Sequence, residues 1–163
     1  MEQASTKSAF SLRRLCQLSF ANQGLMMLVY LVGLFVAIGV RSLTTDEVAS
    51  YVSAQAREAG AQDRLPQLLR TAELFRTSGI WLMLAFTLRT FARFLGVLGM
   101  WRGKASGFHI YTLAQLLGMV PPLLILGPQS FEWMGLIAVL LWCLMYWIRM
   151  REAGFIGGPL KED

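Results

Sequence analysis

Four long apolar blocks alternate with polar segments along the chain, and each is long enough to cross a bilayer as a helix of about 20 residues. The predicted spans cover residues 24–40, 77–100, 108–126 and 131–148. Lipid offers the backbone no hydrogen-bond partners, so such segments satisfy their polar groups internally as helices. The pattern predicts an all-α fold, a four-helix transmembrane bundle, within one integral membrane domain of residues 1–163.

The two ends of the chain are more polar than the blocks. Residues 1–23 mix apolar positions with Arg13, Arg14 and Gln17, which is typical of an amphipathic helix in the membrane interface. Residues 149–163 follow the last block and read as a tail. We therefore expect an interfacial N-terminal segment before the first span and a short C-terminal tail after the fourth.

Residues 41–76 form a hydrophilic segment between the first two blocks, and its pattern is helical. Thr44 followed by Glu47 matches a capping box at the start of a helix. Asp63 and Pro66 mark the start of a second helix that can run directly into the second span. The segment is predicted to form a helical cap outside the membrane.

Composition and charge agree with a membrane protein and indicate its orientation. The chain is 55% hydrophobic and 15% charged, whereas soluble domains carry about 25% charged residues. The net charge of +5 does not indicate nucleic-acid binding, because the basic residues flank the spans. The positive-inside rule places both termini in the cytoplasm, since five basic residues fall in 41–76 and eight fall on the other side. Those eight are Lys7, Arg13, Arg14, Arg102, Lys104, Arg149, Arg151 and Lys161.

Two cations interrupt the second apolar block. Arg89 and Arg93 are four residues apart, so they share one helical face. A charge at the bilayer centre costs roughly 2.5–3.5 kcal/mol on insertion scales, which makes such a residue a candidate functional site. In the sequence, no acidic residue falls at the same depth, because Glu132 lies at the outer edge of the fourth span.

The counter-charge for these arginines is therefore expected from outside the chain. It could be a lipid phosphate, a bound anionic ligand or a carboxylate of another subunit. If the span is shifted toward Leu74, both side chains reach lipid phosphate by snorkelling. Arg102 and Lys104, in the basic turn after the span, are further candidates for binding a partner or a lipid.

Two polar residues mark the third block. Gln115 lies at mid-depth and is expected to hydrogen-bond between helices, or else to line a polar path together with Arg89. His109 lies near the inner end of the same block and is a second candidate for that path. It could also ligate haem iron with the arginines on the propionates, although a bis-histidine site needs a second histidine.

The sequence contains no motif for soluble catalysis. Cys16 and Cys143 form no CxxC or Cys/His cluster, and the methionines lack the spacing of a copper site. A nucleophile–base pair and a glycine-rich phosphate loop are also missing from the sequence. We therefore expect a protein that is not an enzyme, with no metal and no cofactor.

A basic turn, a Gly-Phe-x-x-Tyr motif and a glutamine-containing span follow one another in the second half of the chain. The motif and span residues are Gly107, Phe108, His109, Ile110, Tyr111, Gln115, Gly118 and Pro121. In this order of features, the second half of the chain resembles small bacterial four-span integral membrane proteins, a group without an assigned activity. The resemblance implies a location in the bacterial inner membrane and a four-helix fold.

Taken together, these features favour a small non-catalytic integral membrane subunit or accessory protein. Arg89 and Arg93 would contact a partner carboxylate or lipid phosphate within a larger complex or a homo-oligomer. Two alternatives stay open: a transporter or channel component that acts as an oligomer, and a haem- or quinone-binding redox subunit.

Overall fold

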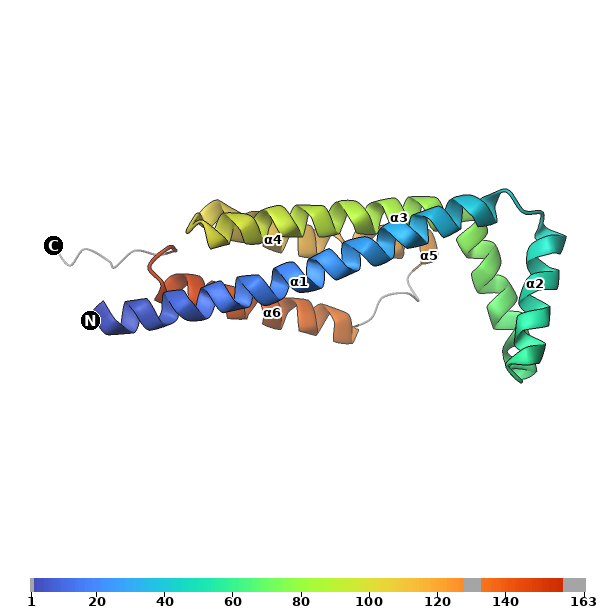
Figure 1. Ribbon diagram of the computed structural model, residues 1–163, viewed down its shortest axis with the longest axis horizontal. Coiled ribbons are helices and arrows are strands. Elements are labelled where there is room, and N and C mark those ends of the chain that lie inside the picture. Colours follow the sequence, from blue (N-terminus) through green and yellow to red (C-terminus); the bar gives the residue numbers. More distant parts are fainter. Residues whose placement is uncertain (1, 128–132, 157–163) are drawn as a thin grey trace. The chain divides into compact units, whose positions relative to one another are not determined.

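The computed structural model describes residues 2–127 and 133–156, and these form helices with no strand among them (Figure 1). The helices are α1 (Glu2–Arg41), α2 (Thr45–Glu58), α3 (Leu65–Trp101), α4 (Ala105–Leu117), α5 (Val120–Leu126) and α6 (Trp133–Glu152), with a short 3-10 turn, η1 (Gln62–Arg64), before α3. The predicted all-α fold is confirmed.

Four segments of the structure are long and apolar enough to cross a membrane. They are Leu12–Arg41, Gln62–Trp101, Ala105–Ile125 and Trp133–Glu152. Most of their side chains point outward, and large apolar residues such as Phe35, Leu88 and Leu124 are 69–78% exposed. A surface of this kind is stable against lipid and costly in water. The chain is therefore a multi-pass membrane protein.

Helix boundaries differ from the sequence pattern in two places. The predicted N-terminal segment and first span form one helix, α1, without a break at residue 23. The third span is interrupted at Gly118 and Met119, between α4 and α5. Pro121 and Pro122 lie in the first turn of α5, where backbone N–H groups have no acceptor within the helix, so the missing N–H of proline costs no hydrogen bond.

The chain divides into two compact units. One unit, here called the cap unit, comprises residues 28–87, and the other, the bundle unit, comprises residues 1–27 and 88–163. In the cap unit, the Gly33 backbone allows close approach of the Met83 side chain, and Gly79 lies against Ala37. Tyr30 and Phe86 stack with ring centroids 5.3 Å apart. These contacts join α1 to α3.

The first turn of α2 carries the predicted capping box. The Thr44 backbone N–H donates to Glu47 Oε2 at 2.7 Å, and the Glu47 N–H donates to Thr44 Oγ1 at 3.3 Å. The backbone and side-chain hydrogen bonds from Thr44 hold the pKa of the Glu47 carboxyl below its ordinary value of 4.5. The stability that this carboxylate contributes is thus present above pH 4.5 and is lost as the pH falls through the lowered pKa.

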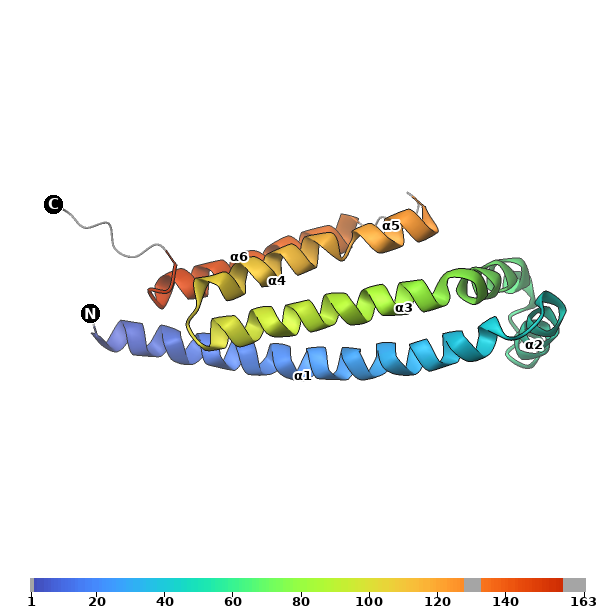
Figure 2. The ribbon, with the colours of Figure 1, turned by 90° about the horizontal axis from the view of Figure 1, so that it is seen from above.

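The bundle unit is built around a core to which four helices contribute. Figure 2 shows α4 and α6 running side by side, and contacts between these two helices are extensive. Phe20 of α1 packs against Phe94 and Trp101 of α3, with ring centroids 5.1 and 6.0 Å apart. The buried core residues are Leu12, Cys16, Val97, Met100, Tyr111, Cys143, Tyr146 and Met150.

Candidate functional site

Arg89 and Arg93 lie on the face of α3 that contacts α4. Arg89 Nη2 donates to Gln115 Oε1 at 2.9 Å and lies 3.5 Å from the Gln115 backbone oxygen. The Arg93 guanidinium carbon lies over the Tyr111 ring, 5.6 Å from its centroid. Gln115 and Tyr111 are four residues apart on α4, which matches the spacing of the two arginines. The predicted pair of cations therefore meets a matched pair of polar side chains.

Gln115 is the centre of this network, here called the arginine network (Arg89, Arg93, Tyr111 and Gln115). Its side chain is buried, with 4% of the residue exposed. The amide oxygen accepts from Arg89, and Gln115 Nε2 donates to the Tyr111 hydroxyl at 3.1 Å. The oxygen and the nitrogen of the Gln115 amide therefore each have a hydrogen-bond partner within the protein, as buried polar groups usually do. The sequence-based expectation that Gln115 hydrogen-bonds between helices is confirmed.

Arg93 is held by an aromatic ring. A guanidinium within about 6 Å of a ring centroid is attracted to the π face, and the attraction grows when the pair is desolvated. Tyr111 is fully buried, and its other neighbour is the Tyr146 ring of α6, 5.0 Å away. Among the described residues, Arg93 Nε is buried and has no hydrogen-bond partner. The cation is thus positioned by Tyr111 but keeps donor capacity unused at Nε.

The aromatic contacts continue from Tyr111 to α1. Trp142 packs edge-on against Tyr146, with centroids 6.3 Å apart. The Tyr146 hydroxyl donates to the Leu15 backbone oxygen of α1 at 3.4 Å. These contacts therefore connect Arg93 and Tyr111 to α6 and, through the hydroxyl of Tyr146, to α1.

Glycines allow the arginine network to form. A Cβ atom at Gly96 would lie 2.7 Å from the Tyr111 backbone nitrogen, and one at Gly99 would lie 2.7 Å from Gly107 Cα. Gly118 leaves room for the Arg89 side chain, which a Cβ atom there would overlap. Small residues of this kind permit close contact between helices in membranes.

Some buried polar residues of the bundle unit were missed by sequence reasoning. Gln23 Nε2 donates to Ser19 Oγ at 3.0 Å, and both residues, with Thr90, are at most 3% exposed. The signal was present, because Ser19 and Gln23 are four residues apart on a helix that is otherwise apolar nearby. Gly96, Gly99 and Gly107 were equally visible as small residues on both sides of the basic turn.

The remaining predicted site residues lie apart from the arginine network. Arg102 and Lys104 are exposed in the turn between α3 and α4. His109 is exposed, with its ring 5.8 Å from the Phe108 ring, whereas Gln115 is buried. The structure thus joins Gln115 to Arg89 but does not join it to His109. Glu132, the carboxylate expected at the outer edge, lies outside the described residues.

The acidic, histidine and cysteine side chains can be located in the part of the chain that the structure describes. No three His, Cys, Asp or Glu side chains gather there as metal ligands would. Cys16 and Cys143 are buried free thiols. The transporter and the haem or quinone alternatives stay predictions.

Comparison with known proteins identifies no relative of this chain. No family model matches the chain, and neither the curated proteins nor the solved structures contain a significant match.

Proposed function

We propose that the chain is a small non-catalytic subunit or accessory protein of a membrane complex, in which Arg93 binds a carboxylate of a partner. The observation that carries the proposal is the half-buried Arg93 of a candidate spanning segment, which joins neither of the ion pairs found among the described residues. The proposed location is the bacterial inner membrane, with both termini in the cytoplasm. The charge distribution supports this orientation by the positive-inside rule.

The two arginines have different proposed roles. Arg89 donates a hydrogen bond to Gln115 and so links α3 to α4. Arg93 stacks on Tyr111, and because its Nε is buried, a partner carboxylate would accept from the two terminal nitrogens of the guanidinium. A cation without a counter-charge is costly within the membrane, so a partner that supplies a carboxylate gains binding energy at this position.

The test is recovery of the partner with variants of Arg93. Arg93→Leu removes the charge and the donors, and Arg93→Lys keeps the charge without the planar fork. Arg70→Leu is the matched control, because Arg70 is also an arginine of α3 and is exposed. After cross-linking in membranes and mild solubilisation, Arg93→Leu is expected to recover about tenfold less partner, the loss expected for one charge-assisted contact, and Arg70→Leu the normal amount.

The competing outcomes are distinct. Unchanged assembly and unchanged lipid content in Arg93→Leu would contradict the proposal. Loss of one bound phospholipid with the protein partner retained would also overturn it, and would identify lipid phosphate as the acceptor. Helical content measured by circular dichroism separates these outcomes from misfolding.

A further inference from the structure

A second basic site lies in the bundle unit, outside the arginine network. Residues from the N-terminal half of α1, the end of α3 with the turn that follows it, and the segment after α6 surround a pocket of about 320 Å³. Arg13 and Arg102 contribute the cations, and the apolar lining includes Leu12, Trp101 and Phe155. We infer that this pocket binds the headgroup of an anionic phospholipid.

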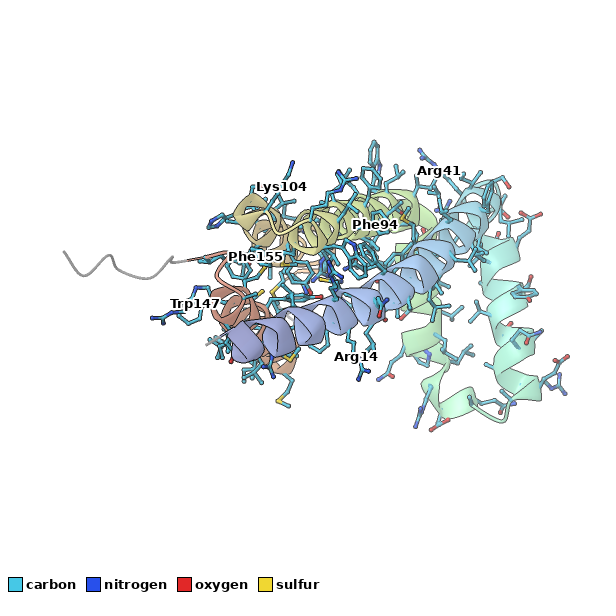
Figure 3. All side chains as sticks on the ribbon, turned by 60° about the vertical axis from the view of Figure 1, so that its left-hand side comes forward. Arg14, Arg41, Phe94, Lys104, Trp147 and Phe155 are labelled. Atoms are coloured by element: carbon cyan, nitrogen blue, oxygen red, sulfur yellow. The ribbon has the colours of Figure 1, made fainter. Side chains whose placement is uncertain are left out.

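The shape of the pocket depends on a glycine turn. Gly103 has φ of +71°, a conformation that other residues adopt at a cost, and it closes the chain between α3 and α4. Phe155 packs directly on this turn, since a Cβ at Gly103 would lie 2.8 Å from Phe155 Cε1 (Figure 3). The segment after α6 therefore completes a wall that α1 and α3 leave open.

The electrostatics of the pocket favour an anion. Among the described residues, the ion pairs join Arg76 to Glu73 and Arg149 to Glu152, and neither includes Arg13 or Arg102. Both cations are exposed, so their donors can turn toward a ligand. Arginine binds phosphate oxygens with two donors at once, which makes a phosphate group the best match for this pair.

The position of the pocket along the helices indicates a lipid as the source of that phosphate. Trp101 is the last residue of the candidate span Gln62–Trp101, and the pocket includes the turn residues Arg102 and Gly103 that follow it. The ends of spanning helices lie where the headgroups of phospholipids lie, and tryptophan is enriched at that depth. Basic pockets between such helix ends bind anionic headgroups. Leu12, Trp101 and Phe155 offer apolar surface to the adjoining glycerol and acyl groups.

This inference requires only that the chain is integrated in a membrane and does not depend on the proposed role of Arg93. Failure of one leaves the other standing, because the two experiments change different residues and measure different ligands.

The test is titration of the purified protein in mild detergent with phosphatidylglycerol or phosphatidylcholine, read by native mass spectrometry. Arg13→Gln combined with Arg102→Gln is expected to weaken phosphatidylglycerol binding about thirtyfold, the loss expected when two cationic contacts to an anionic headgroup are removed. The matched control combines Arg41→Gln with Arg57→Gln, which removes the same charge at exposed residues that do not line the pocket. The control is expected to bind as the unaltered protein does.

Three results would overturn the inference. They are equal weakening in both double variants, equal affinity for phosphatidylcholine, and displacement of the lipid by millimolar glycerol phosphate, which would identify a site for free phosphate. Photoactivatable phosphatidylglycerol tests the unaltered protein without substitutions. We expect cross-links at Leu12, Arg13, Trp101 or Phe155, and cross-links confined to other residues would contradict the site.

Discussion

The Arg89 guanidinium is held in a spanning helix by a neutral partner. The amide oxygen of Gln115 accepts a hydrogen bond from Arg89, and the amide nitrogen of Gln115 donates one to the Tyr111 hydroxyl. Hydrogen bonds to charged groups contribute about 1.5–3 kcal/mol in water-soluble proteins, whereas bonds between membrane helices average about 0.6 kcal/mol. Because it combines a charge with burial, the Arg89–Gln115 bond should lie near the upper end of the membrane range.

A double-mutant cycle measures this bond directly. Arg89→Met and Gln115→Leu, alone and together, are expected to give a coupling energy of about 1–2 kcal/mol when unfolding is followed in mixed micelles. The control cycle pairs Arg89→Met with Leu113→Ala, a substitution on the exposed side of α4. A coupling energy no larger than that of the control would show that the contact does not stabilise the bundle.

The chemistry of these residues was predictable, but their pairing was not. A charge and an amide within apolar blocks stand out in any sequence, so Arg89, Arg93 and Gln115 were recognised as candidates. Which of them meet depends on how far α4 is shifted along α3, and the turn at Gly103 sets that shift. Tyr111 was also hard to recognise as a partner, because an aromatic residue in a membrane helix is usually a lipid or core contact.

At the scale of the elements, close approach of α3 and α4 depends on the absence of side chains. Gly96 faces the backbone of Tyr111, which cannot move aside without separating the helices. Gly24 of α1, in contrast, has no atom within 4 Å of a Cβ position. The two glycines therefore form a matched pair for substitution.

Alanine at these two positions is expected to have opposite effects. Gly96→Ala should destabilise the bundle by about 1–3 kcal/mol through overpacking. Gly24→Ala should stabilise it by about 0.5–1 kcal/mol, because glycine costs that much in a helix interior. Unfolding of both variants in mixed micelles is the measurement. Equal stability of the two variants would contradict the contact between Gly96 and Tyr111.

The elements themselves followed closely from the sequence, with informative exceptions. Hydrophobic length placed the four spans, and Thr44 with Glu47 placed the start of α2 correctly. The pattern did not reveal that α1 continues through residue 23, since interfacial and spanning helices have the same backbone. The interruption of the third span between α4 and α5 also lay outside the hydrophobic pattern, and Pro121 and Pro122 fit there because the first turn of a helix tolerates proline.

At the scale of the whole molecule, apolar length and charge distribution carry most of the predictive information. Four apolar segments in a helical chain identify a multi-pass membrane protein. The pocket of Arg13 and Arg102 did not follow from the sequence, because Phe155 completes it from about fifty residues beyond the turn. A pocket formed by residues far apart in the sequence depends on how the helices pack, and a local sequence pattern does not predict that packing.

The most direct test of the account is the topology of the chain in its membrane. Single cysteines replace Ser42, Lys104 and Glu152, all exposed, in a chain whose Cys16 and Cys143 are changed to alanine. Labelling with a membrane-impermeant maleimide is compared between intact cells and inverted membrane vesicles. Four membrane crossings predict that Ser42→Cys reacts from one side and that Lys104→Cys and Glu152→Cys react from the other. With the proposed cytoplasmic termini, Ser42→Cys is the one that reacts from the outer side. Labelling of all three positions from the same side would contradict the account.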